Sequence, residues 1–214
     1  MKILLTGFEP FGGSQTNPSE QVVRALAHEN LGATPRHRLG AGVKLSTAIL
    51  PVDRVHGPAA LIRAYEEHQP DAVLCLGEAS RRLAISIERV AINLMDYRIA
   101  DNAGNQVVDE PIVRDAPAAY FTTLPVRAIL NAVRACGVPA ELSLSAGAYL
   151  CNQVTYALLH YLTQNKLKTP AGFVHLPALP EQVIDKQPLI PSMSLETMLK
   201  GIRAIINVLD TGKK

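Results

Sequence analysis

Segments typical of buried strands alternate with segments typical of amphipathic helices along this chain of 214 residues. Such alternation predicts βαβ units, and therefore an α/β fold with a largely parallel sheet. We expect strands at 2–7, 43–52, 71–77, 85–95, 141–146 and 172–176. We expect helices at 18–32, 57–69, 126–133, 152–164 and 195–209. No repeat or domain boundary interrupts the pattern, so residues 1–214 are expected to form a single domain.

Composition limits both the core and the partners. Hydrophobic residues make up 48% of the chain but aromatic residues only 5%, so the core must be built from aliphatic side chains. A net charge of +2 without a basic run argues against a nucleic-acid partner. No stretch approaches the roughly 18 apolar residues of a membrane span, and the apolar amino-terminal run is too short for a secretory signal. We therefore expect no membrane association.

Cysteine usage indicates a reducing compartment. The chain has three cysteines, Cys75, Cys136 and Cys151. Their odd number and their spacing fit neither a disulfide framework nor a zinc site. Reduced thiols and a cytoplasmic location are therefore expected. Cys75 lies within a predicted strand and Cys136 near a helix end, so both are interpreted as packing residues.

Cys151 stands apart because it lies where a predicted strand turns into a helix. The unpaired backbone N–H groups and the macrodipole of a helix start favour an anion, which lowers a thiol pKa from about 8.5 toward neutrality. The same N–H groups suit the oxyanion that forms after attack on a carbonyl. A buried structural cysteine is nevertheless the commoner fate of a free thiol. This local context alone leaves both interpretations open.

A cysteine nucleophile needs a base, and His175 is the best candidate because it lies at the end of an apolar strand. In an open parallel sheet, the carboxyl ends of strands border the ligand crevice. A histidine on such a strand is, however, more often a satisfied structural residue. The other histidines lie in polar or helix-end contexts and are expected to be solvated: His28, His37, His56, His68 and His160.

Glu88 is the unusual acid, because it lies in an alternating, strand-like segment. It would share a face with Ser86 and Val90. Such an acid is commonly exposed or paired with a neighbour, here Arg89, but it is also the group that would orient an imidazole. Spacing does not decide between these roles.

The 96–120 segment lacks periodicity and carries several turn-forming residues. A loop of this length in a compact domain is usually functional or part of an interface.

Six segments, taken together, resemble the pyroglutamyl peptidase I family, whose members are also called pyrrolidone-carboxylate peptidases. They occur in the family's order and spacing and extend from Lys2 to about Gln182. They are TGFEPFGG at 6–13, NPS at 17–19, ERVAIN at 88–93, DNAGNQ at 101–106, SAGAYLCN at 145–152 and GFVHLPALPEQ at 172–182.

The resemblance implies a cysteine peptidase that removes an amino-terminal pyroglutamyl residue from peptides through a thioester acyl-enzyme. Its catalytic triad would be Cys151, His175 and Glu88. The family's fold would be an α/β/α sandwich around a twisted, mostly parallel sheet. The resemblance also implies no metal or other cofactor, and often a homotetramer.

The resemblance implies a substrate pocket as well. Phe8 and Phe11 would pack on the flat lactam ring. Core packing is the alternative for both, but the glycines around them favour a loop at the lip of the site. The residues implied at the pocket are Phe8, Phe11, Asn17, Glu78, Arg98, Ile99, Tyr149 and Leu150.

One loop departs from the family pattern. The family usually has Gly-Gln-Ala-Gly-Gly-Arg where this chain has GEASRR at 77–82. Glu78 replaces an amide, and two glycines that permit unusual backbone angles are replaced by Ser80 and Arg81. We expect Glu78 to point away from the lactam, toward Arg81 or Arg82, and the lactam to be recognised by backbone groups.

Two other classes of function stay open at this point. A nucleoside-phosphorylase-like enzyme would need a basic phosphate cradle, for which 81–82 is the sole candidate segment. A non-catalytic oligomeric binder of small molecules would tolerate loss of the triad, yet all three of its positions are filled.

Overall fold

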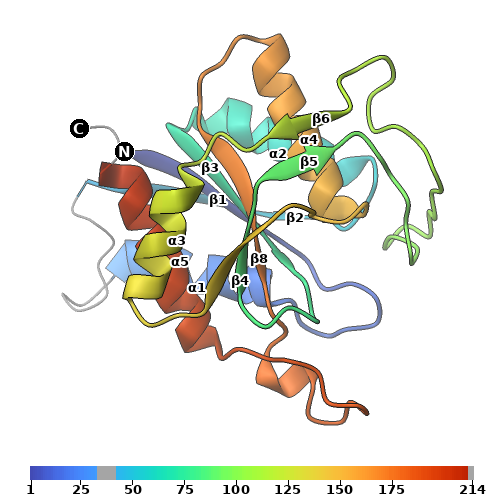
Figure 1. The fold of residues 1–214 in the computed structure, drawn as a ribbon. Helices are drawn as coiled ribbons and strands as arrows, with labels where there is room; N and C mark the ends of the chain where they lie inside the picture. Colours follow the sequence, from blue (N-terminus) through green and yellow to red (C-terminus); the bar gives the residue numbers. More distant parts are fainter. Residues whose placement is uncertain (33–41, 212–214) are drawn as a thin grey trace.

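A computed structural model describes residues 1–32 and 42–211 of the chain. Its centre is a six-stranded sheet in the order β2-β1-β3-β8-β4-β7 (Figure 1). The strands span Lys44–Leu50 (β2), Lys2–Phe8 (β1), Ala72–Glu78 (β3), Ala171–Leu176 (β8), Ile85–Glu88 (β4) and Ala140–Ser143 (β7). The first four run parallel, whereas β4 is antiparallel to β8 and β7 follows the direction of β4. This mixed, mostly parallel sheet confirms the predicted fold class.

Helices cover both faces of the sheet. A hydrophobic cluster lies on each face, between the sheet and the helices, because alternate strand residues point to opposite faces. The helices span Pro18–Gly32 (α1), His56–His68 (α2), Val126–Ala135 (α3), Leu150–Gln164 (α4) and Leu195–Thr211 (α5). On β8, Val174 packs with α1, α3 and α5, whereas Phe173 packs with α2 and α4. The result is the expected α/β/α sandwich.

The predicted 85–95 strand divides in two. After β4 the chain leaves the main sheet and forms β5, Val90–Ile92, which pairs antiparallel with β6, Ala119–Phe121. Neither β6 nor the 3-10 helix η1, Pro180–Gln182, was predicted. The reason for β6 is physical: three residues acquire strand geometry by pairing with a segment far away in the sequence, which no local pattern records.

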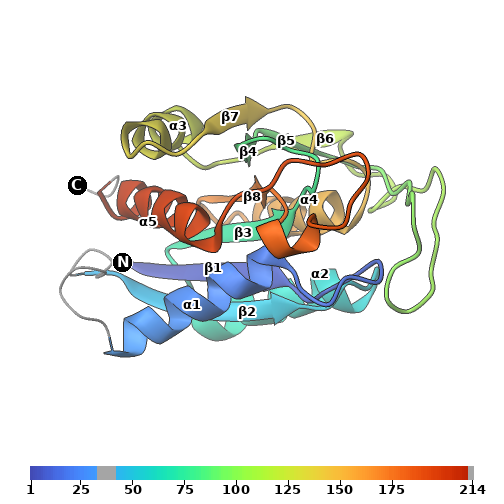
Figure 2. The same ribbon diagram turned by 90° about the horizontal axis from the view of Figure 1, so that it is seen from below.

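The irregular segment that follows β5 projects from the end of the molecule opposite Met1 (Figure 2). Backbone hydrogen bonds fold it back on itself: Met95 and Glu110 bond in both directions, at 2.7 and 3.1 Å, and Tyr97 N–H donates to Val107 at 2.7 Å. The Asn93 side chain adds a 2.8 Å bond to the Val113 carbonyl. The loop is therefore ordered by its own contacts.

No helix within the described ranges is both long and apolar enough to cross a membrane.

Candidate active site

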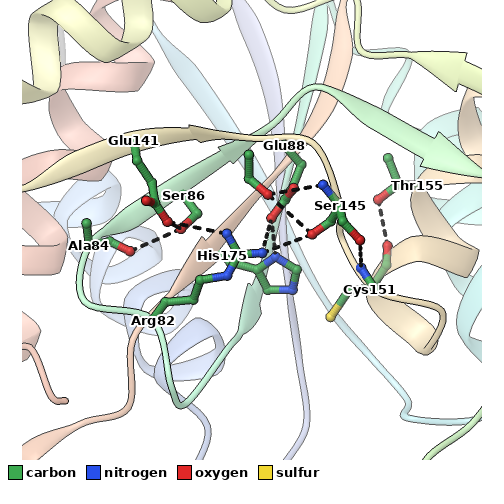
Figure 3. A network of polar contacts seen from close by, with 11 residues as sticks. Arg82, Ala84, Ser86, Glu88, Glu141, Ser145, Cys151, Thr155 and His175 are labelled. Carbon is green, nitrogen blue, oxygen red and sulfur yellow. Dashed lines mark hydrogen bonds and ion pairs between the residues drawn. The ribbon is translucent and has the colours of Figure 1, made fainter.

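Glu88 and His175 form a buried pair on one face of the sheet. In the register of β4 and β8, His175 lies opposite Ser86, so Glu88 is its diagonal neighbour on the same face. Nδ1 of His175 lies 2.8 Å from Oε1 of Glu88, and the two side chains are 5% and 1% exposed (Figure 3). Glu88 is thus neither an exposed residue nor the partner of Arg89.

Arg82 holds the same carboxylate from the other side. Its Nη2 donates to Oε1 of Glu88 at 3.2 Å and to the Ser145 carbonyl at 2.9 Å, and its Nη1 lies 3.4 Å from Glu141 (Figure 3). Oε2 of Glu88 has no hydrogen-bond partner in the part of the chain that the structure describes. A buried carboxylate needs a cation, and Arg82 supplies it whether or not His175 is charged.

Cys151 is the second residue of α4, as the turn at 145–152 predicts. Gly77 brings its sulfur close to the sheet: a Cβ added there would lie 2.9 Å from Sγ of Cys151 and 2.6 Å from the Phe173 ring. Gly77 is also paired directly with His175 between β3 and β8. In Figure 3 the Cys151 side chain points toward the imidazole from the side away from Glu88.

The expected lowering of the Cys151 pKa is wrong. Burial raises the pKa of this thiol, and the negative charges of Glu88 and Glu78 raise it further; the backbone N–H of Cys151 acts in the opposite direction but does not prevail. Desolvation penalises the thiolate more than the helix start favours it. The thiol therefore needs a neighbouring proton acceptor, and the imidazole of His175 is the one beside it.

Asn152 fixes the start of α4. Its Oδ1 accepts from Ile92 N–H at 2.9 Å, and its Nδ2 donates to the carbonyls of Ile92 and Leu94 at 2.9 and 3.1 Å. The side chain thereby ties the residue after Cys151 to β5. Sequence reasoning gave Asn152 no role, because its burial and its bonds to a distant segment exist only in the assembled fold.

A cavity of about 520 Å³ opens beside Cys151 and His175. Glu88 lies behind His175 and does not line it. Every residue that the sequence predicted for the pocket does: Phe8, Phe11, Asn17, Glu78, Arg98, Ile99, Tyr149 and Leu150.

The apolar wall of this cavity differs in part from expectation. Phe8 is the last residue of β1 and is buried against Phe173, with ring centroids 6.5 Å apart, so it is not part of a loop. Phe11 does lie in the loop, 6.0 Å from the Tyr149 ring. The Asn17 Oδ1 accepts from Ser19 N–H at 2.9 Å and so caps the start of α1.

Comparison with known proteins identifies the family. The family model described as pyroglutamyl peptidase matches residues 1–211. The chain belongs to the pyroglutamyl peptidase family. A pyrrolidone-carboxylate peptidase from Vibrio vulnificus is 47% identical over 205 residues, which cover 96% of this chain and 91% of that protein.

Solved structures of pyroglutamyl peptidases have the same fold. Pyroglutamyl peptidase I from Bacillus amyloliquefaciens superposes with a TM-score of 0.88 at 36% identity, covering 98% of this chain and 97% of that one. A mutant pyrrolidone carboxyl peptidase from the hyperthermophile Pyrococcus furiosus gives 0.91 at 40% identity, covering 99% of each chain.

In this pyroglutamyl peptidase family member, Glu78 is tied to Gln182, not to an arginine. Gln182 Nε2 donates to Oε2 of Glu78 at 3.1 Å. The prediction of an Arg81 or Arg82 partner is wrong for Glu78, because Arg82 is bound to Glu88 and η1 brings Gln182 beside Glu78. Burial raises the pKa of Glu78, and the Gln182 hydrogen bond opposes that effect.

The other described thiols and histidines do not line the catalytic cavity. Cys75 is buried, and burial raises its pKa to about 12. The Cys136 thiol donates to the Val133 carbonyl at the end of α3. His160 is half-buried, stacked on Tyr156, so its expected solvation is wrong. His37 lies outside the described residues.

Within the described ranges, no group of three or more His, Cys, Asp or Glu side chains is placed to hold a metal ion.

Proposed function

We propose that residues 1–214 form a single peptidase domain that removes an amino-terminal pyroglutamyl residue from peptides. Cys151 is the nucleophile, His175 the general base, and Glu88 the residue that orients the imidazole. The observation that carries this assignment is the position of the His175 imidazole between Glu88 and Cys151. The ring is held by Glu88 at 2.8 Å on one side, and the Cys151 thiol points toward its other side (Figure 3). Family membership supports the same reaction.

The reaction follows from this arrangement. Sγ of Cys151 attacks the carbonyl that links pyroglutamate to the next residue, while His175 takes the thiol proton. The backbone N–H groups in the first turn of α4 suit the resulting oxyanion. The imidazolium then donates its proton to the leaving amine, and a thioester remains on Cys151. Water, deprotonated by His175, attacks the thioester carbonyl. The C–S bond breaks, pyroglutamate is released, and the imidazolium returns the proton to Sγ of Cys151.

Recognition of the lactam is assigned to the 520 Å³ cavity. Pyroglutamate has no free α-amino group, so the site must grip a flat, mostly apolar ring. Phe8, Phe11 and Leu150 supply apolar walls. Glu78 supplies a polar side chain to the same cavity.

The test is release of a chromogenic amine from its pyroglutamyl derivative, with and without a thiol alkylator. We expect turnover that the alkylator abolishes and that is independent of phosphate. Phosphate-dependent turnover would indicate a phosphorylase, and tight binding without thiol-dependent turnover a binder. The comparisons support neither alternative.

We further propose a homotetramer. Large apolar side chains are exposed at the β4–β7 edge of the sheet and on β6, namely Leu83, Leu144 and Phe121, at 78%, 67% and 69%. An open sheet edge beside such residues favours association. Sedimentation at micromolar concentration is expected to give about four times the 23.1 kDa chain mass. A species of about 23 kDa alone would contradict it.

A cytoplasmic location is proposed because all three cysteines are free and the nucleophile must stay reduced. Cell fractionation with a periplasmic and a cytosolic marker tests it, and activity in the periplasmic fraction would be the contrary result.

A further inference from the structure

A second cavity, of about 980 Å³, adjoins the catalytic one. The two share Ala79, Ser80, Arg82 and Arg98 in their walls. The other residues lining the second cavity are Arg81, Lys186, Gln187, Pro188, Ile190 and Pro191.

Positive charge dominates this second cavity. Its walls contain Arg81, Arg82, Arg98 and Lys186, and none of the described residues that line it is acidic. Arg82 is occupied by Glu88 and Glu141. Arg81, Arg98 and Lys186 are exposed and form no ion pair with any residue in 1–32 or 42–211. Clustered cations without counter-charges attract an anion.

The chemistry of the catalytic site indicates which part of a substrate reaches this cavity. His175 must protonate the leaving amine, so the residue after pyroglutamate begins on the His175 side. Arg82 shares the Oε1 atom of Glu88 with His175, and its side chain lines the catalytic cavity together with His175. Arg82 is in turn part of the wall that the two cavities share.

We propose that the second cavity binds a carboxylate carried by the residue that follows pyroglutamate. The preferred substrates are then short pyroglutamyl peptides with an anionic second residue. The carboxylate comes either from an acidic side chain or from the free carboxyl end of a pyroglutamyl dipeptide. This inference rests on the proposed peptidase function.

Three matched substrates test the proposal with the whole protein: pyroglutamyl-glutamate amide, pyroglutamyl-glutamine amide and pyroglutamyl-glutamine with a free carboxyl end. We expect kcat/KM to be about three- to tenfold higher for at least one anionic substrate than for the neutral amide, since exposed ion pairs are individually weak. The ratio should fall as salt is added. The anionic substrate that shows the gain identifies the source of the carboxylate.

Variants locate the effect. In Arg81→Ala, Lys186→Ala and the double variant, the anionic-to-neutral ratio should fall toward one, and Arg81→Glu should invert it. Arg127→Ala is the matched control, because Arg127 is an exposed arginine on α3 and lines neither cavity. Its ratio should equal that of the wild type.

A wild-type ratio of one, or a ratio that the double variant leaves unchanged, would overturn the proposal while the peptidase function stands. No turnover of the neutral amide or either anionic peptide would instead overturn the peptidase function, and this inference with it.

Discussion

Nδ1 of His175 lies 2.8 Å from Oε1 of Glu88, and both side chains are almost wholly buried. An ionised carboxylate only accepts hydrogen bonds, so the pair requires a proton on Nδ1. The other ring nitrogen is then unprotonated and free to take a proton from a thiol. The tautomer that a cysteine peptidase needs is thus selected by a neighbouring strand.

Cys151→Ala should abolish pyroglutamyl hydrolysis because the only nucleophile of the mechanism is lost. The melting temperature should change little, since an alanine fits the space of the thiol. Cys75→Ala and Cys136→Ala are the matched controls and should stay active, because neither side chain lines the catalytic cavity. Substantial hydrolysis by Cys151→Ala would remove it from the mechanism.

His175→Ala should lower kcat by at least the ~10²–10⁴-fold that positioned proton transfer contributes. Glu88→Gln keeps the shape of the carboxylate but loses the charge that stabilises an imidazolium, so we expect a smaller, still clear loss of kcat. Steady-state kinetics at neutral pH measure both. Near-normal kcat in His175→Ala would mean that another residue is the base.

The raised pKa of Cys151 predicts how alkylation depends on pH. A thiol whose pKa is raised stays protonated at neutral pH and becomes reactive only as the solution turns alkaline. In His175→Ala, the rate of iodoacetamide reaction at Cys151 should therefore keep rising up to about pH 9 without a plateau. The wild-type protein should react faster at pH 7. A plateau near neutrality in the variant would show that the helix start alone activates the thiol.

Arg82 is a positioning residue for Glu88. Arg82→Ala leaves that buried carboxylate with one partner, so its hold on the imidazole loosens, and kcat should fall on the order of tenfold to a hundredfold. KM should change little by comparison. Arg82→Lys keeps the charge but loses the planar fork that reaches Glu88 and Ser145 together, so it should restore only part of kcat. If Arg82→Ala lowered the melting temperature but left kcat unchanged, the role of Arg82 would be purely structural.

Glu78→Gln tests recognition of the lactam. Because burial raises the pKa of Glu78, its ionised form destabilises the folded state, and this cost appears as pH rises from the ordinary carboxyl range through the raised value. The melting temperature and lactam binding of the wild type should therefore fall over that interval, and those of Glu78→Gln should not.

At neutral pH, we expect kcat/KM of Glu78→Gln to differ by less than about tenfold, or ~1.4 kcal/mol. A gain of a hundredfold or more would mean that Glu78 spoils the pocket and that pyroglutamyl peptides are poor substrates of this chain.

Local pattern predicted most of the fold and the positions of the candidate residues. Cys151 at a helix start and His175 near the end of a buried strand follow from hydrophobic periodicity, which records what each residue buries. The eight pocket residues came from the family resemblance. All of them line one cavity.

Contacts between distant segments were not predictable in the same way. Glu78 and Gln182 are 104 residues apart, and no periodicity in either segment indicates that they meet. The antiparallel course of β4 sets the Glu88–His175 contact, yet an isolated strand carries no signal of direction. The predicted lowering of the Cys151 pKa was wrong for a related reason. The helix start is a local feature, whereas burial and the two carboxylates from β3 and β4 come together only in the assembled fold.

Gly77 limits how this site can be redesigned. Cys151 is carried by α4, and its sulfur lies so close to β3 that a single methyl group at position 77 would come within 2.9 Å of Sγ and 2.6 Å of the Phe173 ring. Libraries that alter specificity can vary residues around the cavity, whereas any side chain at position 77 would displace the Cys151 sulfur or the Phe173 ring. A sequence search for active relatives should accordingly weigh a glycine at this place as heavily as the thiol it faces.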